Sequence, residues 1–215
     1  LLVSTLAEIF KGNQALSKDQ WIYPHRNWKA HPVILLDFSE MGSGEIGLEE
    51  AINRELDKIA TAYDISLKAT TNALKFRELI KELAQEEKVV ILIDEYDKPI
   101  INHIEHLPQA QKNREILKNL YSVIKGSDSY IEFFFLTGVS RFSQVSIFSD
   151  LNNLNDITLK RKYAQLAGYT SEEIEVFFKD YLDELHTQYQ DSFPTIMPEI
   201  QRWYDGYSWD GVTHV

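Results

Sequence analysis

The chain has 215 residues, of which 44% are apolar and 26% charged, with a formal net charge of −11 at pH 7 and no cysteine. This composition predicts one substantial core, or a core with a small satellite, and argues against intrinsic disorder. The acidic balance argues against general binding to nucleic-acid backbones, and the lack of cysteine excludes disulfides and fits a cytoplasmic protein. No apolar run approaches the roughly 20 residues that a membrane helix needs, so we expect no membrane association.

The first predicted elements are a helix over residues 1–10 and a buried-type strand over 33–38. The helix begins without a capping residue or the charged segment of a signal peptide, so we expect the chain to be a fragment of a longer protein. A glycine-rich turn follows the strand. Apolar residues at steps of three and four then predict helices over 48–59 and 72–83.

The most informative segment is 89–99, where five apolar residues run directly into Asp94 and Glu95. An unbroken apolar run suits a strand covered on both faces, and open α/β sheets bind ligands at the carboxyl ends of their strands. P-loop nucleotide hydrolases use this arrangement as the Walker B element. Its aspartate helps to hold Mg²⁺, and the following acid can polarise the attacking water. The alternative is a buried strand that leaves the core through a solvated acidic turn.

A helix over 116–124 and a third strand over 130–137 complete an alternation of strands and helices. This alternation predicts an α/β fold, a P-loop NTPase-like, mostly parallel sheet with helices on both faces. Beyond it we expect a short strand over 157–159, a capping box from Thr170 to Glu173, and helices to about residue 185 and over 196–204. The predicted domains are a core over 1–167 and a helical subdomain over 168–215.

A series of motifs resembles the bacterial AAA-ATPase-like domain family, and the motifs lie in the family's order across nearly the whole chain. They include Phe10-Lys11-Gly12, Ile91-Leu92-Ile93-Asp94-Glu95-Tyr96-Asp97-Lys98-Pro99-Ile100, Phe135-Leu136-Thr137-Gly138-Val139-Ser140-Arg141-Phe142-Ser143 and Trp203-Tyr204-Asp205-Gly206-Tyr207.

This resemblance implies a P-loop ATPase that binds ATP with Mg²⁺, often ahead of a PD-(D/E)XK nuclease-like domain at the C-terminal side. In the family, a phosphate-binding loop comes just before a helix that looks like residues 1–6. No GxxxxGK[ST] occurs in these 215 residues, so the strand and Walker A motif of the family are missing here. We expect the segment alone to bind ATP very weakly and to hydrolyse it poorly.

The resemblance also implies roles for individual residues. Asp94 is the expected Mg²⁺ ligand, because Mg²⁺ needs only one or two carboxylates when phosphates and water complete its shell, and Glu95 is expected to orient the attacking water. Thr137 and Ser140 are candidate contacts to the nucleotide, and Arg141 is a candidate to stabilise charge on the γ-phosphate. Two alternatives stay open: Thr137 satisfies local backbone, and Arg141 is a surface residue paired with an acid. Arg141 acting on a neighbour would require a homo-oligomer.

Other polar residues have simpler interpretations. We expect Asp37 to begin a turn, and Asp97 to cap or orient the turn ahead of Pro99. His103 and His106 are three residues apart, as some zinc ligands are, but no third ligand is evident.

Three functions compete. The leading hypothesis is Mg²⁺-dependent ATP hydrolysis in the full-length protein. The alternative is a nucleotide-responsive interaction or regulatory module with little hydrolysis. A metal-dependent nuclease built on the Asp94 cluster fits less well, because the lysine spacing fails for Glu95 and the net charge is negative.

Overall fold

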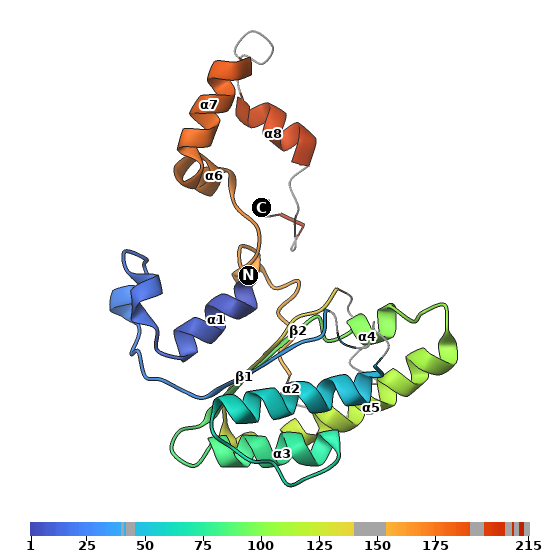
Figure 1. Ribbon diagram of the computed structural model, residues 1–215. Helices are drawn as coiled ribbons and strands as arrows, with labels where there is room; N and C mark the ends of the chain where they lie inside the picture. Colours follow the sequence, from blue (N-terminus) through green and yellow to red (C-terminus); the bar gives the residue numbers. More distant parts are fainter. Residues whose placement is uncertain are drawn as a thin grey trace. The chain divides into compact units, whose positions relative to one another are not determined.

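In the computed structural model, the described residues are 1–39, 41, 46–139, 154–189, 196–204, 208 and 211–212. The chain divides into two units, Leu1–Asn153 and Leu154–Val215, shown in Figure 1. This division lies earlier in the chain than the 167/168 boundary expected from the sequence.

The first unit is built around a three-stranded parallel sheet, so the predicted α/β class is confirmed. The strands are β1 (Val33–Asp37), β2 (Val89–Asp94) and β3 (Ile131–Leu136), in the spatial order β1-β2-β3. The register places Asp37 beside Asp94 and Ile93 beside Leu136. The central strand β2 is buried along its apolar run, which explains why valine and isoleucine dominate it.

One face of the sheet is covered by α1 (Leu2–Phe10). Val3 and Ala7 of this helix pack in one cluster with Val33, Val90 and Leu92. Side chains alternate along a strand, so the neighbouring strand residues point to the opposite face. That face is completely buried at Ile34, Leu36, Ile91 and Ile93.

The opposite face is covered by α2 (Leu48–Ala62), α3 (Asn72–Leu83) and α5 (Leu107–Lys125), as Figure 1 shows. Their buried stripes fall at helical spacing and pack against one another: Ile52 and Leu56 on α2, Phe76, Leu79 and Ile80 on α3, and Leu117, Leu120 and Ile124 on α5. Helices on both faces of a parallel sheet are therefore confirmed.

Helix α1 runs against the direction of the strands (Figure 1). At its far end, the Phe10 carbonyl accepts a hydrogen bond from the His31 amide at 2.8 Å, two residues before β1 begins. The helix therefore begins toward the carboxyl ends of the strands, the edge where Asp94 lies.

Short elements complete this unit. They are the 3₁₀ turns Gln14–Ser17, Tyr23–His25 and Asp128–Tyr130 and the one-turn helix α4 (Lys98–Ile101), which begins just beyond β2.

The second unit is helical in its described residues. It contains a 3₁₀ turn (Arg161–Tyr163), α6 (Ser171–Phe177), α7 (Lys179–Tyr189) and α8 (Ile196–Tyr204). The predicted capping box is confirmed, since the Thr170 hydroxyl accepts from the Glu173 amide and the Glu173 carboxylate accepts from the Thr170 amide.

Two details predicted for this unit are wrong. The expected single helix is interrupted at Phe178, whose backbone (φ −112°, ψ 17°) leaves the helical range and ends α6. The expected strand over 157–159 is a turn. Its Asp156 carboxylate accepts from the Thr158 amide at 3.0 Å, and the Ile157 carbonyl accepts from Lys160. A side chain that satisfies the backbone locally in this way competes with strand pairing.

Candidate active site

Asp94 and Thr137 meet at the carboxyl ends of neighbouring strands. Asp94 is the last residue of β2 and Thr137 directly follows β3. The Thr137 hydroxyl donates a short hydrogen bond to Asp94 Oδ1, and the Glu95 amide donates to the same oxygen at 3.1 Å. The described residues donate no hydrogen bond to Oδ2 of this half-buried carboxylate.

Backbone pairing brings these two side chains together. The Thr137 amide donates to the Ile93 carbonyl and the Tyr96 amide donates to the Thr137 carbonyl, each at 2.9 Å. The pairing between β2 and β3 therefore continues past the ends of the regular strands. The Thr137 side chain is held beside Asp94 by the main chain on both sides of it.

Glu95 stands in a constrained turn. Its φ of +51° is in the left-handed region, which non-glycine residues seldom adopt, and its carbonyl accepts from the Lys98 amide at 3.0 Å. Such a conformation costs about 1–3 kcal/mol and is concentrated at functional sites. Left-handed backbone at Glu95 lets the chain turn sharply at the sheet edge while Asp94 stays in register.

The Glu95 carboxylate lies beside a cation. Its Oε2 is 3.4 Å from Lys98 Nζ, and each side chain is 34% exposed. This oxygen is itself inaccessible to solvent and accepts no hydrogen bond from a described residue. The ion pair has the spacing i, i+3, which is visible in the sequence, but no sequence pattern indicated a role for Lys98 at this site.

Asp97 corrects one expectation. It occupies the position before α4, but its side chain does not cap that helix. It is instead fully buried, and its Oδ1 accepts from the Val139 amide at 3.1 Å, across the sheet edge from its own turn. Sequence spacing favoured the local interaction because Asp side chains commonly bond the turn that follows them.

The buried Tyr121 side chain, on α5, contacts the turn that follows β2. Its hydroxyl donates to the Tyr96 carbonyl at 3.4 Å, and the side chain is buried. Burial raises the pKa of this phenol well above its usual range, and nearby Tyr96 and Asp97 raise it further. The phenol therefore stays neutral and keeps its proton for donation. From the sequence, Tyr121 is only one residue of the predicted helix over 116–124.

Asp37 lies beside Asp94 in the register of β1 and β2, but its side chain is exposed and accepts from the Ser39 amide at 2.8 Å. The prediction that Asp37 begins a turn is confirmed. Ser140 and Arg141, the other predicted site residues, lie outside the described residues.

The described residues contain no group of three or more histidine, cysteine, aspartate or glutamate side chains arranged to hold a metal ion. A protein-only metal cage is therefore not formed in this part of the chain. The donor set at Asp94 fits Mg²⁺ in the other way that proteins bind it. One carboxylate and a neighbouring hydroxyl suffice when phosphate and water oxygens supply the remaining ligands.

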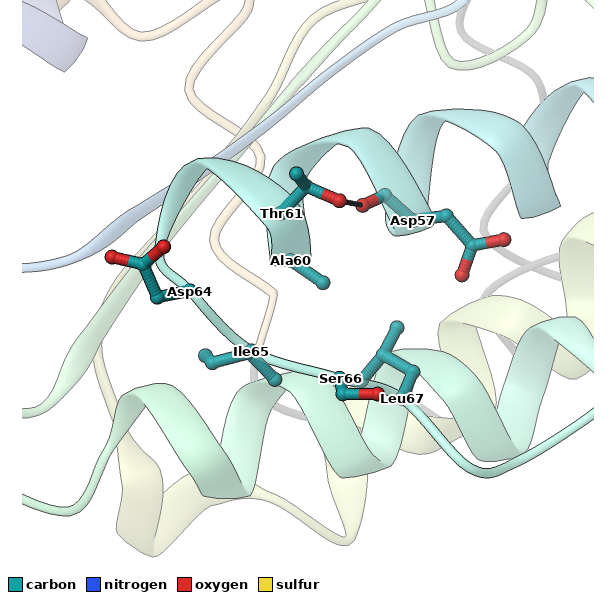
Figure 2. Close-up of a pocket in the computed structure, with 7 residues that line it drawn as sticks. All are labelled: Asp57, Ala60, Thr61, Asp64, Ile65, Ser66 and Leu67. Carbon is teal, nitrogen blue, oxygen red and sulfur yellow. Dashed lines mark hydrogen bonds between the residues drawn. The ribbon is translucent and has the colours of Figure 1, made fainter.

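Two hollows lined by described residues of the first unit lie away from these residues. Figure 2 shows one of about 420 Å³ between the end of α2 and the segment 64–67. Its carboxylates do not converge: Asp57 is paired with Lys75 at 2.6 Å, and Asp64 points away from the pocket. The next residue along from α2, Tyr63, bonds Val33 at the start of β1, so this hollow lies toward the amino ends of the strands. It is not part of the candidate site.

Comparison with known proteins places the chain in a family. A model of the AAA-ATPase-like family, described as "Predicted AAA-ATPase", matches residues 1–148. A curated relative, "Uncharacterized protein in vnfD 5'region" of Azotobacter chroococcum mcd 1, is 38% identical over 218 residues. The alignment covers 98% of this chain and 40% of that protein, so the chain spans two-fifths of the relative's length. No solved structure matches the chain.

Among the described helices, none combines the length and the apolar character needed to cross a bilayer. The matched residues include the whole of the sheet and both side chains of the Asp94–Thr137 pair. The chain belongs to the AAA-ATPase-like family of predicted AAA-ATPases.

Proposed function

We propose that this chain forms part of a site that binds ATP with Mg²⁺ and hydrolyses it in the full-length protein. The observation that carries the proposal is the pairing of Asp94 with Thr137 at the carboxyl ends of two buried parallel strands, with Glu95 next in the chain. Open α/β sheets bind their ligands at this edge, and a strand-terminal Asp followed by Glu suits phosphoryl transfer to water.

Asp94 is the proposed ligand of Mg²⁺, directly or through a water molecule. The Thr137 hydroxyl and the Glu95 amide both occupy Oδ1, which fixes the carboxylate plane and directs Oδ2 to the cation. Groups that orient a metal ligand in this way contribute strongly to metal affinity. When bound, Mg²⁺ would neutralise charge on the phosphate oxygens of the nucleotide.

Glu95 is the proposed residue that orients and deprotonates the attacking water. Its left-handed backbone fixes the direction in which the side chain leaves the turn, and Lys98 Nζ lies 3.4 Å from Oε2.

Ser140 and Arg141 complete the proposal from sequence. Ser140 would contact the nucleotide, and Arg141 would reach the γ-phosphate of its own site or of a neighbouring subunit, which would then be part of a homo-oligomer. A C-terminal nuclease-like domain in the full-length protein and a cytoplasmic location also remain proposals.

The test substitutes Glu95→Gln in the full-length protein and measures ATP hydrolysis and ATP binding separately. Loss of a general base typically lowers turnover by a factor of about 10²–10⁴ while the neutral amide still fits the site, so we expect hydrolysis to fall and ATP affinity to stay within a few-fold. Unchanged turnover would refute the assignment.

Glu8→Gln is the matched control. Glu8 also pairs with a lysine three residues later, Lys11, at 2.8 Å, but it lies on α1 near the amino ends of the strands. The hydrogen bonds from Lys11 and Asn13 lower the pKa of Glu8, so Glu8 is ionised at neutral pH. Glu8→Gln therefore removes a negative charge from a similar Glu–Lys pair away from the site. The control should keep wild-type turnover.

A second candidate, a nucleotide-responsive interaction module, is favoured by the second unit. Its described helices bury no residue, and Val176, Phe177, Trp203 and Tyr204 are each more than 60% exposed. Single-turnover kinetics separate the two candidates. ATP that binds tightly but is not cleaved within minutes would favour the interaction module.

A further inference from the structure

Asp97 is a buried carboxylate for which the proposed hydrolysis gives no direct role. It is 0% exposed, although charged side chains are rarely buried this completely without compensating hydrogen bonds. The compensation includes the Val139 amide, 3.1 Å from Oδ1. The carboxylate thus joins the turn after β2 to the chain just beyond β3.

This contact extends the pairing of the two strands. The Thr137 amide bonds the Ile93 carbonyl and the Tyr96 amide bonds the Thr137 carbonyl, each at 2.9 Å. At the next step the backbone after Asp97 turns away into α4 and no longer runs beside β3. The Asp97 side chain supplies the acceptor at that point, so the Val139 amide is held by a carboxylate.

Gly138, between the two anchored residues, shows how closely the segments approach. A Cβ at this position would lie 2.4 Å and 2.7 Å from carbons of the Tyr96 ring and 2.8 Å from Asp97 Oδ1. These distances are far below van der Waals contact, so only glycine fits without movement. The backbone of 137–139 is therefore pressed directly against Tyr96 and Asp97.

We propose that Asp97 is a positioning residue of the hydrolysis site. By holding the Val139 amide it fixes the backbone of residues 137–139, and this keeps the Thr137 hydroxyl on Asp94 Oδ1. Asp97 acts through Thr137 and Asp94 and does not itself touch nucleotide or metal. The role in catalysis rests on the proposed function, whereas the hold on residues 137–139 can be measured without it.

A carboxylate suits this task better than a neutral acceptor. Hydrogen bonds to a charged acceptor are about twice as strong as neutral ones, so a carboxylate restrains a backbone amide more tightly than a side-chain amide oxygen does. A substitution Asp97→Asn keeps the size and an acceptor oxygen but removes the charge. Asp97→Ala removes the acceptor altogether. The two variants therefore grade the strength of the restraint.

The matched control is Tyr63→Phe. The Tyr63 hydroxyl accepts from the Val33 amide at 2.9 Å, so this variant also removes a side-chain acceptor from a backbone amide of the same sheet. That contact lies at the amino end of β1, away from Asp94. A general loss of stability would affect both variants, whereas a loss of positioning would affect only the Asp97 variants.

The experiment uses the full-length protein and measures kcat and KM for ATP, the Mg²⁺ concentration that gives half-maximal rate, and amide hydrogen exchange. Loss of a group that orients a metal ligand typically costs about 10–100-fold, and loss of Asp97, which acts on that ligand through Thr137, should cost no more than this. We expect Asp97→Asn to lower kcat and raise the Mg²⁺ requirement, Asp97→Ala to do so more strongly, and KM for ATP to change little. Tyr63→Phe should leave these values at the wild-type level.

Hydrogen exchange decides the structural half of the proposal independently. The amides of residues 137–139 should exchange faster in Asp97→Asn, whereas that of Val33 should do so only in Tyr63→Phe. If the amides of residues 137–139 exchange faster in Asp97→Asn but the protein cleaves no ATP, the proposed function is refuted, whereas the restraint of residues 137–139 by Asp97 is supported. Unchanged exchange there, or wild-type kcat and Mg²⁺ requirement in an active Asp97→Asn protein, would overturn the role of Asp97.

Discussion

The hydroxyl of Thr137 offers the sharpest test of how the site is assembled. Thr137→Val keeps the shape and β-branching of the side chain and removes only the donor to Asp94 Oδ1. The Glu95 amide still donates to that oxygen, so the carboxylate is not left without a partner. Hydrogen bonds to charged groups contribute about 1.5–3 kcal/mol, and partial exposure of this pair puts the expected loss of stability near the lower end.

The larger effect should fall on Mg²⁺. Without the hydroxyl, the Asp94 carboxylate can rotate and Oδ2 is no longer directed to one place. Removal of a group that orients a metal ligand typically costs about 10–100-fold in metal affinity or activity. We expect the Mg²⁺ concentration for half-maximal ATP hydrolysis by the full-length protein to rise by about that factor.

Thr137→Ser is the matched control, since serine keeps the hydroxyl and loses the methyl group. Titration of Mg²⁺ at saturating ATP, together with urea unfolding of each variant, separates metal affinity from stability. If valine and serine at position 137 give the same Mg²⁺ requirement, the Thr137–Asp94 bond has no part in metal binding and the reasoning is refuted.

Three further predictions concern the fold and the isolated chain. Gly138→Ala should destabilise the fold by about 1–3 kcal/mol in urea unfolding because its Cβ meets Tyr96. Gly126→Ala, whose Cβ would meet only the Val123 carbonyl oxygen at 3.8 Å, should cost little, and equal effects at the two positions would contradict the crowding at Gly138. Because the pKa of Tyr121 is raised in the folded protein, the Tyr121 phenol contributes to stability below its unfolded-state pKa of about 10, and this contribution is lost as the pH rises above about 10. Tyr121→Phe should therefore flatten the decline in thermal stability at alkaline pH. The isolated 215-residue chain should show no micromolar affinity for Mg·ATP by calorimetry, since it contains no GxxxxGK[ST]; micromolar binding would show that the missing motif is not needed.

The sequence predicted the sheet well because the signals there are strong and general. The apolar run of β2 can be satisfied only by burial on both faces, and parallel strands separated by helices bring their carboxyl ends to one edge. Asp94 ends one such strand and Thr137 directly follows another, so their proximity follows from the topology. The Thr170–Glu173 capping box was also readable, since it depends on residues three apart.

Other features depend on contacts between segments distant in the sequence. Asp97 has the local pattern of a turn residue, but its partner Val139 lies 42 residues away, and no spacing rule connects them. The close approach of Gly138 to the Tyr96 ring likewise depends on packing between segments that are distant in the sequence. The break at Phe178 was missed because the apolar periodicity continues across it.

A structure of the full-length Glu95→Gln variant with Mg·ATP would test the central claim most directly, because loss of the water-activating group should keep the nucleotide intact. The account predicts the metal at the carboxyl ends of β2 and β3, with an Asp94 oxygen at the usual Mg²⁺ distance of about 2.1 Å or one water away. A nucleotide bound elsewhere, such as the hollow beside Asp57 and Asp64 toward the amino ends of the strands, would contradict it.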